Sequence, residues 1–480
     1  MKKLNAFLVS VLSAAALNAA VIEQVIVRQQ WPWSTDVKVE YKISAVTNPV
    51  DITVEAYNGD TELPLPNAAI TGERFGLTED GVGTLVIDPI AAFGTAKIAL
   101  ANFKVKLTVS DSPENIGETI YRIFDLTDGS CENLARKDIM NHPELYGAYE
   151  TDFSKIGPGF NTTLDDVFIW TGVTNNPIYK TTKLVMRKIP AASLNKVWVC
   201  GSVYGDAYSQ SFSSRVEPVR YIKMTNDYYI GVFELTQKQC ELFYGSNPSA
   251  DTEKGQPDSD WRPVENLAYY SVIGNQRNQG CQRGSTGDPG RPDWPLNNYL
   301  YELGNNTVIL KLQNKTRVEF YLPTQAQWEI ACRAGTDTPF NSGKALTAEN
   351  AYEVGWVQGG EATSSHAVGM KPANAWGLYD MHGNICEFVV SNDLCGDQPG
   401  HGETVDDPVI EPVGLLAVAG SGDRRRCGGS WGTAFGSYRE STSYANTYWQ
   451  SWSNPNPELG LRVVCPVGKR WNGSDKWFGE

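Results

Sequence analysis

The sequence has little positive charge. Its 41 lysines and arginines are outnumbered by 55 aspartates and glutamates, so the formal net charge is −14. Proteins that bind nucleic acid usually carry basic stripes that neutralise phosphates, and proteins that bind anionic membranes carry clusters of lysine and arginine. The composition therefore argues against both classes of partner. The acidity itself reports mainly on solubility and indicates no particular ligand.

Long hydrophobic runs are also missing, apart from one at the N-terminus. Lys2 and Lys3 precede an apolar stretch over residues 4–17, which ends in the small residues of Asn18–Ala20. This arrangement predicts a secretory signal peptide over residues 1–20, because the stretch is too short to span a bilayer comfortably. We therefore expect an exported protein, secreted or held in the cell envelope, with no transmembrane segment in the mature chain. An uncleaved N-terminal anchor is the alternative.

The nine cysteines contain no CxxC spacing, so the sequence does not support a structural zinc site. An oxidising compartment permits disulfides, but an odd number leaves at least one thiol unpaired. Cys332 and Cys386 lie in apolar surroundings and are expected to be small core residues. The four histidines are scattered, so they indicate no proton relay.

Alternating apolar residues dominate the N-terminal part. Residues 37–43, 50–56 and 103–109 each place apolar side chains at every second position, and Asn58-Gly59 is a strong turn signal. Short strands separated by glycine, proline and asparagine predict an immunoglobulin-like β-sandwich over residues 21–115. A second strand-rich module is expected over residues 116–200, followed by a polar linker over residues 201–215.

From residue 216 the pattern changes to short helices and long loops. Thr236 with Gln239 and Thr324 with Gln327 have the spacing of capping boxes, and Gly335 is a suitable end for the second helix. Loops rich in glycine, asparagine, serine and tryptophan fill the rest. The predicted class is α+β, with a domain of low regular secondary structure over residues 216–467 and a polar tail over residues 468–480.

One loop, residues 374–387, reads NAWGLYDMHGNICE and contains two carboxylates seven residues apart. Asp380 and Glu387, with backbone carbonyls between them, could collect the hard oxygen ligands that calcium prefers. The alternative is a turn built by aspartate, glycine and asparagine for backbone reasons alone. His382 is interpreted as a residue of this turn and not as a base.

The C-terminal half resembles the formylglycine-generating enzyme family, also called the sulfatase-modifying-factor domain. Together the matching segments cover about residues 218–467, and their order makes the match far more specific than any single motif. The N-terminal half resembles, more vaguely, the β-rich leader of exported bacterial members. The resemblance implies a variant of the C-type-lectin fold. The matching segments are Tyr229–Thr236, Arg262–Glu265, Leu322–Glu329, Asn374–Glu387, Cys427–Trp431 and Gly460–Val463.

The resemblance implies one calcium site in the loop at residues 374–387. Its ligands would be the side chains of Asp380 and Glu387 and the backbone carbonyls of Gly383 and Ile385. The second calcium site of the family needs a longer preceding loop than residues 359–362 provide, so it is not expected here.

The resemblance breaks at the family's chemistry. Family oxidases activate oxygen with two copper(I)-binding cysteines, three and eight residues after the serine of Gly-Gly-Ser. Counted from Ser430, those positions hold Thr433 and Tyr438, so we expect no copper and assign no catalytic residue. Cys427 lies on the other side of the motif and is expected to be a core thiol or one half of a disulfide. Arg462 is expected to pair with a buried carboxylate such as Glu329.

Aromatic residues alternate with small polar residues between positions 436 and 457, a mixture typical of binding loops. We therefore predict a non-catalytic recognition module that binds a peptide, glycan or protein. The alternative interpretation of the aromatics is a structural core. The alternative function is a formylglycine-generating oxidase acting on sulfatase-type cysteines, or a related modifying enzyme. The predicted binding residues are Tyr438, Tyr444, Tyr448, Trp449 and Trp452.

Overall fold

The computed structural model describes residues 20–30, 32–94, 100–113, 115–151, 168–201, 219–274, 306–390, 402–410, 423–433, 448–451, 454–467, 469–471 and 477–479. The predicted signal peptide and linker lie almost entirely outside these residues. The chain divides into two compact units. The N-terminal unit comprises residues 1–120, 134–150 and 170–175, and the C-terminal unit comprises residues 121–133, 151–169 and 176–480.

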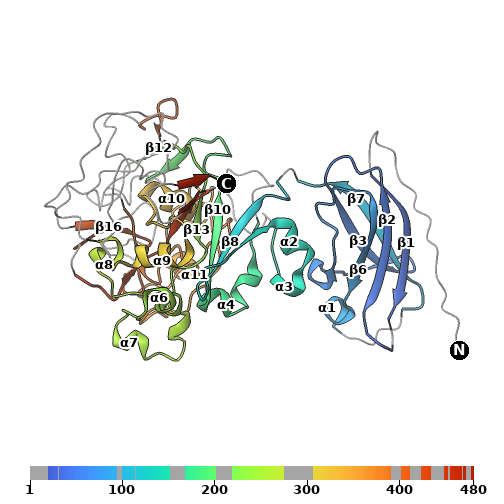
Figure 1. Cartoon of the computed structure of the whole chain (residues 1–480), viewed down its shortest axis with the longest axis horizontal. Helices are drawn as coiled ribbons and strands as arrows, with labels where there is room; N and C mark the ends of the chain where they lie inside the picture. Colours follow the sequence, from blue (N-terminus) through green and yellow to red (C-terminus); the bar gives the residue numbers. More distant parts are fainter. Residues whose placement is uncertain are drawn as a thin grey trace. The chain divides into compact units, whose positions relative to one another are not determined.

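The N-terminal unit contains two antiparallel sheets (Figure 1). The first has the order β1-β2-β6-β5, formed by β1 (Val21–Gln29), β2 (Val37–Ser44), β6 (Gly81–Ile87) and β5 (Ile70–Thr71). The second has the order β4-β3-β7, formed by β4 (Thr61–Leu63), β3 (Val50–Asn58) and β7 (Phe103–Asp111). Apolar residues from both sheets share one core, as the alternation in β2, β3 and β7 predicts.

Short helices connect and follow these strands: η1 (Asn67–Ala69), α1 (Pro89–Phe93), α2 (Arg136–Asn141), α3 (Pro143–Tyr146) and η4 (Thr171–Thr174). The boundaries of α1 have local causes. The Asp88 side chain accepts a hydrogen bond from the Ile90 N–H, and Gly94 ends the helix at φ +70°. The buried side chain of Asn141, at the end of α2, accepts hydrogen bonds from the backbone N–H groups of Arg74 and Phe75.

The central sheet of the C-terminal unit has the order β19-β13-β10-β8-β9. Its strands are β19 (Val464–Pro466), β13 (Tyr228–Gly231), β10 (Lys183–Ile189), β8 (Thr119–Asp125) and β9 (Cys131–Ala135). Strands from residues 116–200 thus pair directly with β13, which belongs to the segment of helices and loops that begins near residue 216.

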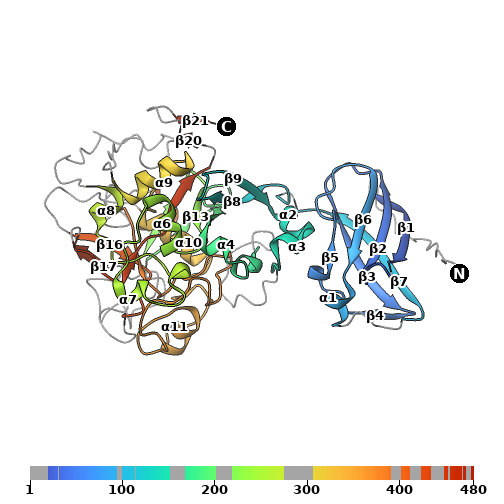
Figure 2. The same cartoon turned by 60° about the horizontal axis from the view of Figure 1, so that its bottom comes forward.

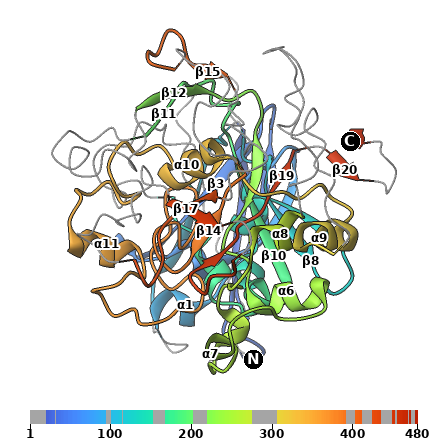
Figure 3. The ribbon, with the colours of Figure 1, turned by 90° about the vertical axis from the view of Figure 1, so that its left-hand side faces the viewer.

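The C-terminal unit also contains short helices, and Figures 2 and 3 show α6, α8 and α9 close to one another. The helices are α4 (Ile178–Thr181), α6 (Gln237–Tyr244), α7 (Asp251–Lys254), η5 (Ser259–Trp261), α8 (Tyr269–Ile273), α9 (Val308–Thr316), α10 (Gln325–Arg333) and α11 (Ala348–Val354). Capping boxes open α6 and α10, as predicted. Ala334 ends α10 at φ +46°, one residue before the expected glycine.

Three smaller sheets complete the C-terminal unit. One has the order β17-β16-β14-β18, formed by β17 (Tyr448–Ser451), β16 (Asp423–Cys427), β14 (Cys386–Phe388) and β18 (Leu459–Gly460). The others contain β11 (Trp198–Cys200), β12 (Arg220–Lys223) and β15 (Val409–Ile410), and β20 (Lys469–Trp471) with β21 (Trp477–Gly479). The predicted mixture of helices and sheets is confirmed. No helix among the described residues combines the length and apolar character needed to cross a membrane.

Candidate cation site and hydroxyl cluster

The loop at residues 374–387, the glycine loop, is held in a tight conformation that its sequence permits. Asp380, Gly383 and Asn384 have φ angles of +55°, +75° and +58°. A Cβ atom at Gly383 would lie 2.4 Å from the carbonyl oxygen of Trp356, so only glycine fits there. The Asn374 side chain anchors the start of the loop, because its Nδ2 donates to the carbonyls of Ala331 and Cys332 on α10.

Glu387, at the end of this loop, is bound by Arg462. The guanidinium donates from Nη2 to Oε1 over 2.8 Å and from Nε to both carboxylate oxygens, and the Trp328 Nε1–H donates to Oε2 over 2.6 Å. The remaining guanidinium N–H groups bond the carbonyls of Gly231, Val232 and Tyr379. Arg462 and Glu387 are 0% and 1% exposed, so this is a buried, fully hydrogen-bonded ion pair.

Arg462 pairs with a buried carboxylate, as expected, but the partner is Glu387 and not the suggested Glu329. Glu329 lies on α10 and binds Arg333, four residues later, with 2.6 Å between Nη2 and Oε1. The same Oε1 accepts a hydrogen bond from the Gly201 N–H over 2.7 Å. One helical turn brings Glu329 and Arg333 together without any long-range folding, so the ion pair of this carboxylate is local.

Asp380 is the second carboxylate of the glycine loop. Its Oδ2 accepts a hydrogen bond from the Gly369 N–H over 2.6 Å, whereas its buried Oδ1 has no hydrogen-bond partner. The side chain is 3% exposed. Burial raises the pKa of Asp380 to about 6, although the Gly369 N–H and the charges of Arg462 and Lys180 act in the opposite direction.

A third carboxylate, Glu234, lies against the glycine loop and was not singled out from the sequence. It follows β13 by three residues and is fully buried. Its Oε2 accepts from the Asn384 Nδ2 over 2.6 Å, and its Oε1 accepts from the Ile385 N–H over 3.1 Å. Burial raises the pKa of Glu234 well above its usual range, and the charges of Asp380 and Glu387 add to the rise. The only signal in the sequence was its place in the first family-like segment.

Of the two side chains that the family pattern implies as calcium ligands, Asp380 is well suited to bind the ion and Glu387 is less suited. The unpartnered Oδ1 of Asp380 is a hard, buried oxygen of the kind that calcium binds. The charge of Glu387, by contrast, is already balanced by Arg462. Within the described ranges no three His, Cys, Asp or Glu side chains form a metal-binding group. A cation at this loop would therefore depend on backbone carbonyls, such as those of Gly383 and Ile385.

A cluster of hydroxyls surrounds Ser430. The Ser430 Oγ donates to the Glu458 Oε2 over 2.5 Å and lies 3.0 Å from the Thr433 Oγ1, which also accepts a hydrogen bond from the Ser430 N–H. Ser430 and Thr433 are both buried. Thr433, the residue at the first cysteine position of the family oxidases, is therefore part of a closed hydrogen-bond network. Tyr438, at the second position, lies outside the described residues.

Two nearby thiols are poorly suited to bind metal. Cys386 on β14 and Cys427 on β16 are both buried. Burial raises the pKa of each thiol, so both stay protonated at neutral pH. The side chains near Ser430 that could bind a metal offer hydroxyl and carboxylate oxygens, whereas copper(I) prefers soft thiolates. The described residues around Ser430 thus do not fit the copper ion that the family chemistry implies.

Of the predicted binding residues, the structure describes the backbone of two. Tyr448 and Trp449 lie on β17, where they pair with Arg426 and Arg425 of β16. Tyr438, Tyr444 and Trp452 lie outside the described residues. The sheet order places β16 between β17 and β14, so the strand with the predicted binding residues and the strand with Glu387 belong to one sheet.

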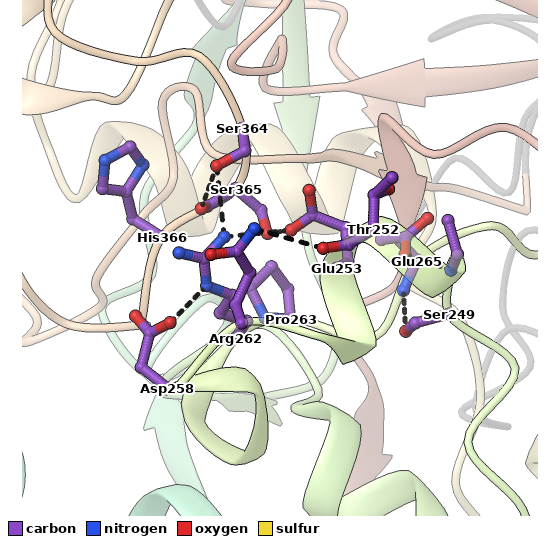
Figure 4. A network of polar contacts seen from close by, with 12 residues as sticks. Ser249, Thr252, Glu253, Asp258, Arg262, Pro263, Glu265, Ser364, Ser365 and His366 are labelled. Carbon is purple, nitrogen blue, oxygen red and sulfur yellow. Dashed lines mark hydrogen bonds and ion pairs between the residues drawn. The ribbon is translucent and has the colours of Figure 1, made fainter.

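A polar network joins residues 249–265 to residues 364–366 (Figure 4). Arg262 binds Asp258 over 2.7 Å and Glu253 over 3.1 Å, and Ser365 donates to Glu253. Glu265 accepts from the Ala250 N–H over 2.7 Å, and burial raises the pKa of Glu265 to about 7. This network was not predicted, because its members are separated in sequence by up to 112 residues.

His366 extends this network to the glycine loop. Its backbone N–H donates to the Asn384 Oδ1 over 2.9 Å, and its ring stacks on the Trp356 ring with 3.8 Å between centroids. The backbone of Asn384 also donates to the Trp356 carbonyl and accepts from the Trp431 N–H. With its bond to Glu234, Asn384 therefore contacts four residues outside the glycine loop.

Comparison with known proteins supports a family assignment. A family model described as "Sulfatase-modifying factor enzyme 1-like domain" matches residues 194–467. The chaperone protein LppX of Paenibacillus barcinonensis is 28% identical over 204 residues, which cover 38% of this chain and 66% of the relative. The match thus spans slightly less than two thirds of that relative's length.

Two solved structures are similar to 59% of this chain. The variable protein 1 of Treponema denticola is 21% identical, with 96% of that chain covered and a TM-score of 0.40. PvdO from Pseudomonas aeruginosa is 17% identical, with 94% of that chain covered and a TM-score of 0.40. Similarity at this level says nothing about the activity of the present chain.

Proposed function

The chain belongs to the sulfatase-modifying factor enzyme 1-like domain family, and we propose that it uses this domain for binding and not for catalysis. Its ligand would be a peptide, a glycan or a protein. The chaperone name of the Paenibacillus relative favours a protein among these three classes. The signal-peptide pattern of residues 1–20 supports a place outside the cytoplasm, either secreted or in the cell envelope.

The observation that carries this proposal is the position of Thr433. The resemblance to the family oxidases requires a thiolate there, and the side chain present is a hydroxyl that is hydrogen-bonded to Ser430. Ser430 is in turn bonded to Glu458. A closed network of hard oxygen atoms stabilises the loop but has no affinity for a soft monovalent metal. The chain keeps the family domain but has no cysteine at either of the two positions that bind copper in the oxidases.

The finer architecture belongs to the same proposal. We infer that the two sheets of the N-terminal unit form an immunoglobulin-like sandwich, which their shared apolar core supports. We infer that residues 216–467 adopt a variant of the C-type-lectin fold, in which long loops supply the ligand-binding face. The short helices and strands of the described residues in that range support this fold.

We propose that the ligand contacts the aromatic segment between residues 436 and 457. Tyrosine and tryptophan provide large rigid contact areas, and small polar residues provide adaptable hydrogen bonds. Support comes from β17, whose backbone pairs with β16 and so gives Tyr448 and Trp449 a rigid base. Rigid elements position a binding site more accurately than isolated loops do.

One calcium ion is proposed as a structural cofactor of the glycine loop. Asp380 and the carbonyls of Gly383 and Ile385 would hold it, next to Glu387. A bound calcium ion supplies positive charge and joins several oxygen atoms of one loop. The protein's own part is to keep the loop in its left-handed conformation, which Gly383 permits and Asn374 anchors.

The binding proposal is tested with the mature chain and the double substitution Trp449→Ala/Trp452→Ala. The probes are a glycan array, a peptide library and immobilised unfolded model proteins. We expect loss of the binding that the wild type shows, with an unchanged melting temperature. The matched control is Trp261→Ala, a tryptophan that is 40% exposed and lies elsewhere in the same unit. Unfolding of the double variant would instead identify these aromatics as core residues and contradict the proposal.

The alternative function, formation of formylglycine, has its own test. The mature wild-type chain is loaded with copper(I) and incubated with oxygen and a sulfatase-type Cys-x-Pro-x-Arg peptide. An aldehyde-specific probe then reports turnover. We expect no aldehyde above the copper-only control. Turnover by the wild type would replace the binding proposal with an enzymatic one.

A further inference from the structure

The proposed cation site contains too little negative charge to balance a divalent ion. In this chain the family's ligand pattern falls on two carboxylates, Asp380 and Glu387. In this chain the negative charge of Glu387 is matched by the buried guanidinium of Arg462, 2.8 Å away. The number of negative ligands is a main determinant of calcium affinity. With Glu387 neutralised, Asp380 alone would face the ion.

Glu234 is placed to restore the missing charge. It is fully buried, and it lies against the loop segment that would hold the ion, because it bonds the side chain of Asn384 and the N–H of Ile385. Ile385 is also one of the two proposed carbonyl ligands, so the Glu234 carboxyl contacts a residue that would itself bind the ion. Both Glu234 oxygens already accept N–H groups, so this side chain acts on the ion without binding it directly.

The unpartnered oxygen of Asp380 points independently to a ligand. A carboxylate oxygen buried without any partner costs free energy, and native proteins rarely leave one. The cations near it are Arg462, which is bonded to Glu387, and Lys180, whose Nζ lies 5.7 Å from the centre of the Phe233 ring. Neither supplies a hydrogen bond to Oδ1. A cation at Oδ1 would remove this cost.

We propose that Glu234 is a positioning residue of the cation site, which takes over the electrostatic role that the family pattern gives to Glu387. When ionised, Glu234 adds its charge to that of Asp380, and its two hydrogen bonds hold the Asn384 side chain and the Ile385 N–H beside the ion. This inference rests on the calcium proposal above. Glu387 serves here as the partner of Arg462 and connects β14 to the segment that follows β18.

The test measures calcium binding to the mature, chelator-treated full chain by titration calorimetry, with calcium as the only ligand. Glu234→Gln keeps the size of the side chain and removes its charge. Loss of a residue that supports a metal ligand typically weakens metal binding by about 10- to 100-fold, and we expect a weakening in that range. The matched control is Glu329→Gln, which removes a second fully buried glutamate from the same unit, and its calcium affinity should equal that of the wild type.

The outcomes separate the two proposals. No calcium binding by the wild type contradicts the calcium proposal itself. Calcium binding that is equal in the wild type and in Glu234→Gln leaves calcium in place and overturns the role of Glu234. Glu234→Asp retains the charge and is expected to stay within about threefold of the wild type, far from the loss expected for the neutral variant. If Glu234→Gln does not fold, a loss of about tenfold or more in Glu234→Asp overturns the inference.

Discussion

Arg462 and Glu387 form the most buried ion pair described in the C-terminal unit, and each also bonds a third group. Glu387 accepts from the Trp328 indole, and Arg462 donates to the carbonyls of Gly231, Val232 and Tyr379. The pair thereby connects α10, β13, the glycine loop and the strand β14. A charge pair in such a place contributes to stability only while both members are present.

Removing one member of this pair is expected to destabilise the unit strongly. Arg462→Met leaves Glu387 buried and unpaired, which typically costs about 3–5 kcal/mol. Urea unfolding followed by tryptophan fluorescence measures the change. The control is Lys344→Met, which breaks the exposed pair with Glu353 and should cost less than about 1 kcal/mol. Equal effects of the two substitutions would show that the buried pair is not a stabilising centre.

Because Gly383 has a left-handed backbone conformation and a close neighbour, we predict that position 383 tolerates no side chain. Gly383→Ala places a Cβ 2.4 Å from the Trp356 carbonyl at a φ of +75°, so the backbone must move. We expect a loss of stability well beyond the roughly 1–2 kcal/mol of left-handed strain alone. Gly245→Ala is the control, because it has a φ of +89° but open space around its Cβ. Differential scanning calorimetry of both variants checks this, and similar melting temperatures would contradict it.

Restoring sulfur at the two oxidase positions is expected to restore metal binding. Thr433→Cys/Tyr438→Cys supplies the soft ligands that copper(I) prefers. Competition with a chromogenic copper(I) chelator should show a new high-affinity site in this variant. Thr433→Ser/Tyr438→Ser has the same spacing without sulfur and should bind no more copper(I) than the wild type. Strong copper(I) binding by the wild type would contradict the proposed loss of the oxidase site.

Glu265 predicts a pH dependence of stability. Burial raises the pKa of Glu265 to about 7 in the folded chain, above its value of 4.5 when exposed. The folded state therefore holds this proton more tightly than the unfolded state does. Stability from this group is fully present below pH 4.5 and is lost as the pH rises through 7.

Glu265→Gln removes that dependence. The wild type should lose more stability than this variant between pH 5 and pH 8, by about 3 kcal/mol at most. Urea unfolding at both pH values measures the difference. Glu353→Gln, at an exposed glutamate of the same unit, should behave like the wild type. Parallel pH profiles of the wild type and Glu265→Gln would show that the carboxyl is ionised in both states.

Local sequence signals predicted the local parts of this structure. The capping boxes at Thr236 and Thr324 depend on residues three positions apart, and both are present. The alternating segments on β2, β3 and β7 are strands for the same reason, because a period of two places their apolar side chains on one face. The family itself was recognisable because its motifs occur in order along the chain.

The surroundings of the cation site could not be predicted in this way. Glu234 meets Asn384 across 150 positions, and Arg462 meets Glu387 across 75. Spacing gives no information about which of several buried carboxylates a distant arginine will reach. The expectation that Arg462 binds Glu329 failed because Arg333 lies one helical turn away on the same helix.

The order β17-β16-β14-β18 has a consequence for engineering. Among the described strands, β17 lies at the outer side of its sheet, whereas β14, which contains Glu387 of the buried charge pair, lies on the far side of β16. We therefore expect residues 448–451 to accept new sequences without loss of the Arg462–Glu387 pair. This family domain is a starting point for libraries of artificial binders, with variation confined to one replaceable edge.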